Sequence, residues 1–362
     1  MKIIITADLH NGIPDKLDDS IWAMDIIRQY AITKNIQHII IAGDLFHDRI
    51  NINIPVLNKV YDFFIRVKKD RQHWYCFPGN HDLFLKNSWE INSLHPFRDL
   101  ISIIEETRSI EIDKQKFWIV PFVYQEKEYM KIINEIESNN HTKNDILLTH
   151  IGANNAKLNE CFLLKNWSII NFDETKFKRI FSGHFHCHQS VGKLLYVGSP
   201  IPFRFDEGVI DHGFITYDTK SESYEFIKIY DICGQFSNRK PPDYITIIDK
   251  DIVSNLKWVN GNYVRIIQLK DYNAMELHKI RNLLMKKGAL KVYFLIQQKQ
   301  ITEAKNTINS KQIGTPEALF KAYIIQDKPE LDITLLKSLF PKIAHEAEEK
   351  MTIEIDNSDA EA

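Results

Sequence analysis

Asp8-Leu9-His10 follows the apolar run from Lys2 to Ile5, with Thr6 and Ala7 between them. Four later fragments also follow short apolar runs of the β type: Gly43-Asp44 after His38–Ala42, Gly79-Asn80-His81-Asp82 after His73–Phe77, His150 after Asp145–Thr149, and Gly183-His184-Phe185-His186 after Arg179–Ser182. Each run is predicted to be a strand. In open α/β folds ligands bind beyond the carboxyl ends of the strands, so we expect these polar side chains to meet at one edge of a sheet.

The residue types in these fragments are those that hold two divalent metal ions. Hydrolysis of a phosphodiester needs a nucleophilic water, a partner for the charged oxygens and help for the leaving alkoxide, and two ions about 3.5–4 Å apart supply all three. A mixed set of nitrogen and oxygen ligands suits Mn, Fe or Zn better than Mg or Ca. The candidate ligands are Asp8, His10, Asp44, Asn80, His150, His184 and His186.

The spacing of the candidate ligands gives each a role. Asp44 is the best candidate for a carboxylate that bridges two ions. Asp8 and His10 alternate with Leu9 as residues of a strand do, so both can face one ion. His184 and His186 repeat that spacing.

His81 directly follows Asn80 and is predicted to point toward the bound phosphate as general acid or transition-state stabiliser. Asp82 is expected to raise the pKa of the His81 imidazole and to fix its orientation. His47, three residues beyond Asp44, is a further candidate for the catalytic site.

Simpler explanations exist for every fragment taken alone. Asp-x-His or Gly-His-x-His is common in ordinary loops, and Gly-Asn-His-Asp has the composition of a turn. The metal site is predicted because all five occur in order after strands. The remaining histidines without that context are expected to be solvated or packing residues: His73, His95, His141, His188, His212, His278 and His345.

With these motifs the chain resembles the calcineurin-like metallophosphoesterase superfamily, and within it the SbcD and meiotic-recombination-eleven branch of DNA-repair nucleases. Gly43-Asp44-Leu45-Phe46-His47-Asp48 is similar to the second motif of that branch. Tyr196-Val197-Gly198-Ser199-Pro200, followed by Phe205-Asp206-Glu207 and Gly213-Phe214, is similar to its segment after the last metal motif. Arg204 departs from the branch, and the short spacing between motifs resembles that of phage-encoded relatives.

The resemblance implies an α/β fold: a four-layer metallophosphoesterase β-sandwich flanked by helices, with a small α+β capping domain and C-terminal helices. It implies two divalent ions, with Mn2+ favoured, one held by Asp8, His10, Asp44 and His186 and the other by Asp44, Asn80, His150 and His184. It further implies an exonuclease and endonuclease, the homodimeric nuclease subunit of an SbcCD-like complex in DNA double-strand-break processing and recombination.

Three parts are predicted along the chain. Residues 1–232 form the nuclease domain, with helices near Asp18–Lys34, Pro55–Lys69 and Leu83–Leu100, and the last two helices are expected to supply a dimer interface. Residues 243–298 form a capping domain of strand, helix and strand (Tyr263–Leu269, Asn273–Lys287 and Leu290–Ile296), for which an unrelated α+β appendage is the alternative. Residues 313–350 form amphipathic helices that dock on an SbcC-type coiled-coil ATPase or fold back on the body.

Length and composition set the remaining expectations. The 362 residues are 44% hydrophobic, enough for one large core and small additional modules. The four cysteines form no C-x-x-C pair, so we expect neither a zinc knuckle nor a disulfide framework. No signal peptide, membrane span or membrane partner is expected, and the predicted location is the cytoplasm. The net charge of −2 is unusual for a protein that binds DNA by itself, because such proteins are often strongly basic. It fits a subunit whose partner contributes much of the affinity for DNA.

Other function classes remain open. A stand-alone metallophosphatase or cyclic-nucleotide phosphodiesterase would use the same metal centre, but would need neither a capping module nor a helical tail. A scaffold without catalytic activity would be expected to have lost ligands, and every expected ligand position is filled. The sequence therefore favours the nuclease, with DNA and an ATPase subunit as partners.

Overall fold

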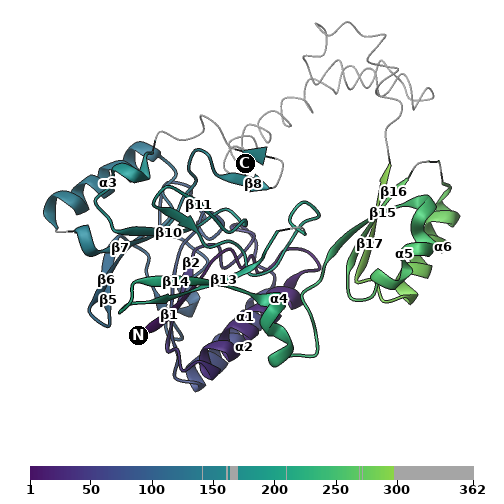
Figure 1. Cartoon of the computed structure of the whole chain (residues 1–362), viewed down its shortest axis with the longest axis horizontal. Coiled ribbons are helices and arrows are strands. Elements are labelled where there is room, and N and C mark those ends of the chain that lie inside the picture. The colour runs from purple at the N-terminus through teal and green to yellow at the C-terminus, as the bar shows by residue number, and fades with distance from the viewer. Residues whose placement is uncertain are drawn as a thin grey trace, which may run out of the picture. The chain divides into compact units, whose positions relative to one another are not determined.

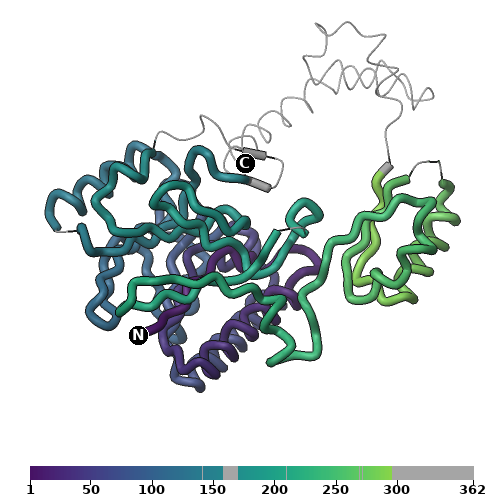
Figure 2. Tube along the Cα trace, viewed as in Figure 1, coloured from purple at the N-terminus to yellow at the C-terminus, as the bar shows by residue number. Residues whose placement is uncertain are grey.

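The computed structural model describes residues 1–296 apart from 141, 160–161, 164–169, 209, 269 and 271 (Figure 2). Residues Met1–Phe294 belong to one compact unit. The predicted helical segment 313–350 lies outside the described residues.

Two six-stranded sheets form most of this unit (Figure 1). The first has the order β14–β13–β1–β2–β3–β4 and contains β1 (Lys2–Thr6), β2 (His38–Ala42), β3 (His73–Phe77), β4 (Ser102–Ile103), β13 (Gly213–Asp218) and β14 (Ser223–Lys228). The second has the order β11–β12–β10–β7–β6–β5 and contains β5 (Arg108–Ile112), β6 (Gln115–Val120), β7 (Ile146–His150), β10 (Arg179–Gly183), β11 (Gln189–Val191) and β12 (Leu194–Tyr196).

Parallel pairing aligns the strands that precede the motifs. β1, β2 and β3 pair in parallel, with Ile5 beside Ile40 and Ile40 beside Tyr75. β7 and β10 also pair in parallel, with His150 opposite Gly183. The five predicted strands before the motifs are thus confirmed, but they lie in two sheets rather than in one, because β6, β7 and β10 form a second parallel core.

The core has three apolar layers, and alternate residues of one strand contribute to different layers. Ile39 and Ile41 of β2 pack toward the helices of the first sheet, whereas Ile40 packs against the second sheet. Both faces of β2 are therefore buried, which explains its continuous apolar sequence. A third layer covers the outer face of the second sheet. The order helix, sheet, sheet, helix confirms the predicted sandwich of four layers.

The helices that cover the sheets are amphipathic. α1 (Leu17–Thr33) and α2 (Ile54–Lys69) pack on the first sheet through residues such as Met24, Phe63 and Phe64. α3 (Glu126–Asn139) packs on the second sheet through Tyr129, Ile133 and Ile136. The remaining helical turns are α4 (Ile229–Ile232), α5 (Ile252–Asn255), and the 3-10 turns His95–Phe97, Thr142–Asn144, Phe172–Glu174, Cys233–Gln235, Asp249–Asp251 and Leu256–Trp258.

A third sheet of three strands follows, in the order β15–β16–β17. Its strands are β15 (Tyr244–Ile248), β16 (Tyr263–Gln268) and β17 (Lys291–Ile296), and α6 (Ala274–Lys286) lies between the last two in sequence. Asn273 caps α6 in a capping box with Glu276. The predicted strand, helix and strand are present, and each of their boundaries agrees with the prediction within one residue. β15 was not predicted. A short hairpin of β8 (Lys157–Asn159) and β9 (Phe162–Leu163) completes the strands.

The predicted helix at Leu83–Leu100 is wrong. This segment contains turns, an isolated bridge between Leu83 and Asn92, and one 3-10 turn at His95–Phe97. Asn92 accepts hydrogen bonds from the backbone N–H groups of Leu94 and His95, which favours a turn over a continuing helix. Among the described residues no helix has both the length and the apolar character needed to cross a membrane.

We predict that the layer between the two sheets contributes most to stability. Phe181 of β10 is fully buried there, with its ring centroid 5.7 Å from that of Tyr217. Phe181→Ala should lower the free energy of unfolding by about 3–5 kcal/mol, because it leaves a cavity between two sheets that cannot close on it. Urea denaturation followed by tryptophan fluorescence would measure this change.

Ile32→Ala is the matched control, because Ile32 lies on α1 with 49% of its surface exposed. Its effect should stay within about 0.5 kcal/mol. Equal effects of the two substitutions would contradict the assignment of the main core to the space between the sheets.

Candidate metal centre

Backbone hydrogen bonds join the loops that follow β1 and β2. The N–H groups of Leu9 and His10 both donate to the carbonyl oxygen of Asp44, at 2.9 and 3.0 Å. Asp8 N–H donates to the carbonyl oxygen of Gly43 at 3.2 Å. The first two motifs are therefore held side by side by their backbones, before any side-chain interaction is considered.

Four of the candidate ligands have a left-handed backbone. The φ angles are 53° at Asp8, 44° at His10, 53° at Asp44 and 93° at His184. Non-glycine residues adopt this region at a cost of about 1–3 kcal/mol each, and such strain concentrates at functional sites. The expected strand-like alternation of Asp8 with His10 and of His184 with His186 is thus wrong. β1 ends at Thr6 and β10 at Gly183, and the turns beyond them aim the side chains.

Glycines allow the motifs to approach one another closely. Gly43 has a φ of +88°, and a Cβ there would collide with the His150 ring. A Cβ at Gly79 would collide with the Asp44 carboxylate. The glycines of Gly43-Asp44 and Gly79-Asn80 therefore make the space that the polar side chains of neighbouring motifs fill.

One group of candidate ligands gathers around His10. Its Nε2 lies 3.0 Å from Nε2 of His186 and 3.8 Å from an oxygen of Asp44. Asp8, His10 and His186 each place a ligand atom within 4.8 Å of the others. His10 Nδ1 is buried and has no hydrogen-bond partner. Two imidazole nitrogens that face each other beside two carboxylates form a set of lone pairs that fits a divalent cation.

A second group gathers around Asn80. Its Oδ1 lies 3.0 Å from Nε2 of His150 and 3.1 Å from Nδ1 of His184. Nε2 of His150 is also 3.2 Å from a carboxylate oxygen of Asp44. Nδ1 of His150 lies 2.9 Å from the carbonyl oxygen of Ala42, a contact that needs the proton on Nδ1 and so leaves the Nε2 lone pair directed inward. Asp44 contacts both groups, as its predicted bridging role requires.

Burial and mutual charge set the protonation of these side chains. Burial raises the pKa of Asp8 to about 6, and the nearby Asp44 carboxylate acts in the same direction. Burial opposes ionisation of Asp44, but the imidazoles of His150 and His81 hold its pKa well below the usual range. Burial and the neighbouring His150 lower the pKa of His184 to about 3, so this imidazole is neutral, as a metal ligand must be.

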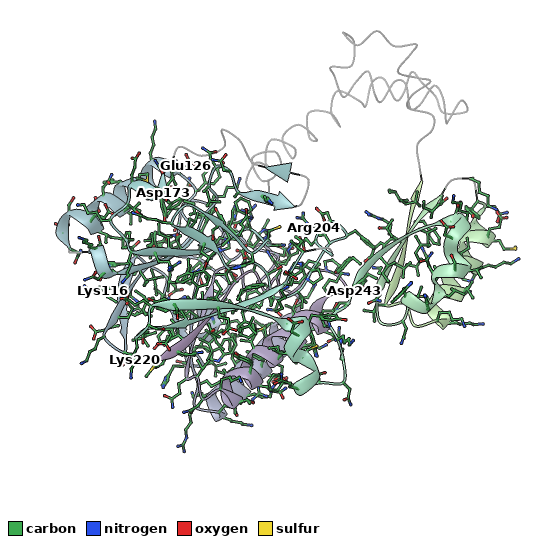
Figure 3. All side chains as sticks on the ribbon, in the orientation of Figure 1. Lys116, Glu126, Asp173, Arg204, Lys220 and Asp243 are labelled. Carbon is green, nitrogen blue, oxygen red and sulfur yellow. The ribbon has the colours of Figure 1, made fainter. Side chains whose placement is uncertain are left out.

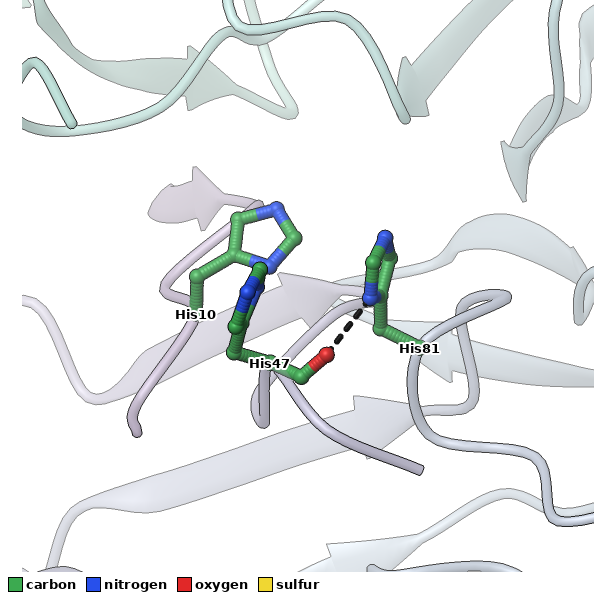
Figure 4. A group of neighbouring side chains, drawn as sticks. All are labelled: His10, His47 and His81. Carbon is green, nitrogen blue, oxygen red and sulfur yellow. Dashed lines mark hydrogen bonds between the residues drawn. The ribbon is translucent and has the colours of Figure 1, made fainter. Parts of the chain in front are cut away.

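His81 and His47 lie together beside this centre (Figure 4). Their rings are stacked with centroids 5.3 Å apart, and the centroid of His10 is 4.9 Å from that of His81. Nδ1 of His81 lies 2.6 Å from the carbonyl oxygen of His47. Donation of the Nδ1 proton to that carbonyl leaves Nε2 as the reactive nitrogen. The structure thus brings both predicted catalytic histidines to the site.

Asp82 has a different place from the one expected. Its carboxylate is fully buried and accepts hydrogen bonds from the N–H groups of Leu45, Phe46 and Gly79 and from the Ser93 hydroxyl. The group that orients the His81 ring is the His47 carbonyl. Asp82 instead connects the loop after β2 to the loop after β3, because its carboxylate accepts hydrogen bonds from both.

Glu207 is a functional candidate that the sequence reasoning did not assign. It is fully buried, and its Oε1 lies 2.8 Å from Nδ1 of His186. Burial opposes ionisation, but His186 lowers the pKa of Glu207 to about 2. Arg204, labelled in Figure 3, donates to the same oxygen at 3.0 Å. The departure at Arg204 thus has a structural partner. Glu207 stands in the segment that resembles SbcD-type proteins, but its contact with a predicted ligand 21 residues earlier left no local signal in the sequence.

The histidines expected to be solvated or to pack do so where the structure describes them. The His188 ring stacks on Phe226 at 3.9 Å, and His212 contacts Ser199 and the Glu207 backbone. None of His73, His95, His188, His212 and His278 belongs to a cluster of metal-ligating side chains in the described chain. His141 and His345 lie outside the described residues.

The chain is similar to several known proteins. An uncharacterized protein of Acanthamoeba polyphaga mimivirus is 23% identical over 354 residues, which are 90% of this chain but only 25% of that protein. Exonuclease subunit 1 of Enterobacteria phage T4 is 24% identical over 63% of this chain and 67% of its own length. A dimetal phosphatase from Danio rerio is 12% identical with a TM-score of 0.41 over 60% of this chain and 91% of its own.

The sequence profile of the calcineurin-like phosphoesterases matches residues 1–188. That range contains all seven candidate ligands, so the profile covers the whole predicted metal centre. The chain therefore belongs to the calcineurin-like phosphoesterase family.

Proposed function

We propose that this chain is a manganese-dependent DNA nuclease, with exonuclease and endonuclease activity, and the nuclease subunit of an SbcCD-like complex that processes double-strand breaks. One observation carries the proposal: the buried contact between Glu207 and His186. It joins the segment through which the sequence resembles SbcD-type nucleases to a predicted metal ligand. The similarity to a phage exonuclease subunit supports the same assignment.

The residues present fit two divalent cations. The Asp44 carboxylate contacts both groups of candidate ligands, and the Nε2 atoms of His10 and His186 face each other at 3.0 Å. Asp8, His10, Asp44 and His186 would hold one ion and Asp44, Asn80, His150 and His184 the other. When bound, such ions polarise phosphoryl oxygens and lower the pKa of a coordinated water. We propose Mn2+ because imidazole and carboxylate ligands together suit it.

The residues of the chain would supply position and proton control. The His47 carbonyl fixes the His81 ring, so that Nε2 can hold a proton for the leaving oxygen or stabilise developing charge. Glu207 orients His186 and increases its basicity, as carboxylates commonly do for histidines that bind metals. Asp82 keeps the loops after β2 and β3 in register, which holds Asp44 and Asn80 together.

The partners would be DNA, a second copy of the chain and an SbcC-type coiled-coil ATPase. The two ATPase-binding helices are proposed for residues 313–350, outside the described part of the chain. A stand-alone metallophosphatase or cyclic-nucleotide phosphodiesterase would use the same centre, and the first experiment below separates these possibilities.

We predict that Mn2+, and Mg2+ to a smaller extent, supports digestion of end-labelled linear DNA. His81→Ser should slow digestion by about 100-fold or more, because it removes a group that handles a proton. Calorimetric titration should still detect Mn2+ binding to this variant. His95→Ser, at an exposed histidine outside the site, is the control and should cleave like the wild type.

Two outcomes would contradict this prediction. Loss of Mn2+ binding in His81→Ser would show that His81 is a ligand and not a catalytic residue. Rapid hydrolysis of a small phosphodiester without digestion of any DNA would favour the phosphodiesterase.

We predict that Glu207→Gln weakens metal binding through His186. The substitution keeps the shape of the side chain but removes its charge, and it should raise the Mn2+ concentration for half-maximal binding by about 10-fold or more. Asp206→Asn is the matched control from the same segment, where the carboxylate is half exposed, and it should change that concentration little. Calorimetry measures both. Equal weakening in the two variants would show that Glu207 has no specific role.

We predict that residues 313–362 hold the ATPase. A chain truncated after residue 312 should no longer copurify with a coexpressed SbcC-type ATPase, yet it should retain Mn2+-dependent cleavage of a short oligonucleotide. Retention of the ATPase would contradict the docking role. Loss of the folded core on truncation, seen by circular dichroism, would show that these helices pack on the body instead.

A further inference from the structure

A cavity of about 590 Å³ lies between the segment that follows Asp82 and the loop that follows β6. Its lining includes three aromatic residues, Trp89, Phe122 and Tyr124, and two polar residues, Asn87 and Ser88. None of these five residues belongs to the candidate metal centre or has a role in the proposed chemistry. The cavity therefore needs an explanation of its own.

Phe122 places this cavity next to the metal centre. Its ring centroid lies 6.3 Å from that of His184, at an interplanar angle of 28°, and 6.3 Å from that of His150. Phe122 is also among the residues that line the cavity, so the same residue neighbours both the cavity and two predicted metal ligands. In a nucleotide the base is one sugar away from its phosphate. A phosphate at the metal centre would thus place a neighbouring base within reach of the cavity.

Hydrogen bonds hold the backbone of Phe122 in place. The N–H of Phe122 donates to the carbonyl oxygen of Pro78 at 3.0 Å, directly before the Gly79-Asn80 motif. The indole N–H of Trp89 donates to the carbonyl oxygen of Phe122 at 2.7 Å. The position of the cavity relative to the metal centre is therefore built into the same loops that hold the candidate ligands.

The charges around the cavity suit a neutral flat ring better than a phosphate. Three cationic residues (Lys86, Arg98 and Arg108) line it beside four anionic residues (Glu90, Glu105, Glu106 and Glu128). Arg98 and Glu105 form an ion pair with each other. With this balance the lining gives no net attraction for an anion, whereas aromatic faces stack on any nucleobase.

Tyr124 is the ring best placed to stack. It is 38% exposed, and Lys86 Nζ lies 4.8 Å from its ring centroid. A base inside a duplex is stacked and paired on both sides, and taking it out costs a few kcal/mol. An unpaired base, in a single strand or at a frayed end, can enter without that cost.

We propose that this cavity receives an unpaired nucleobase of the strand whose phosphodiester lies at the metal centre. The inference rests on the proposed nuclease function and adds to it the form of the substrate. It makes Tyr124 a residue that selects single-stranded or frayed DNA. Small phosphate esters have no base, so the cavity would not strengthen their binding.

The test compares two single-stranded oligonucleotides that differ only in the bases beside the scissile phosphate. One is unmodified, and in the other the flanking positions are abasic. In Mn2+ the wild-type protein should cleave the unmodified strand with kcat/KM about tenfold higher than the abasic strand. Tyr124→Ala should reduce this preference to nearly one by slowing cleavage of the unmodified strand alone. Tyr124→Phe should keep the preference because it keeps the ring.

Tyr230→Ala is the control, since Tyr230 is an exposed tyrosine on α4 with 53% of its surface accessible. It should cleave both strands like the wild type. Equal cleavage of both strands by the wild type, or an unchanged preference in Tyr124→Ala, would overturn the base-binding role while leaving the nuclease intact. Failure of the wild type to cleave either strand, together with hydrolysis of a small phosphodiester, would overturn the proposed nuclease function and this inference with it.

Discussion

Asp8 and Asp44 are carboxylates buried in one cluster with His150, with ligand atoms no more than 4.8 Å apart. Burial of two such charges is unfavourable unless partners compensate for them. Burial raises the pKa of Asp8, and the imidazoles of His150 and His186 oppose that rise, whereas those of His150 and His81 hold the pKa of Asp44 well below its usual range. The remaining architecture brings these imidazoles to the carboxylates, and it produces a set of nitrogen and oxygen donors that two cations would complete.

The sandwich makes that arrangement possible because its two sheets end on the same side. Backbone hydrogen bonds join the loops after β1 and β2 of the first sheet. His184, which follows β10 of the second sheet, donates its N–H to the Asp8 carboxylate at 2.9 Å and so joins the two sheets. Left-handed turns at Asp8, Asp44 and His184 store strain that the surrounding hydrogen bonds must offset. Asp82, which accepts four hydrogen bonds from two loops and a serine, contributes to that framework.

The candidate site includes groups that position other side chains. The Glu207 carboxylate contacts the His186 ring, and the His47 carbonyl oxygen contacts the His81 ring. Phe122 contacts the rings of His150 and His184 and forms a wall of the adjacent cavity. Phe122 thus lies next to both the metal centre and the cavity, and substitutions at cavity residues that do not neighbour the candidate ligands, such as Tyr124, are expected to act on substrate preference and not on metal binding.

The sequence by itself determined the candidate ligands and the strands before them, because each motif is local: a short β-run, a turn and a polar side chain. It also indicated α1, α2 and α6 through their amphipathic patterns. Only the tertiary structure decided that β1–β3 belong to one sheet and β7 and β10 to another, that Asp82 binds backbone N–H groups and that Glu207 reaches His186. Those facts depend on contacts between residues far apart in the chain and on backbone angles, and neither leaves a periodic pattern in the sequence.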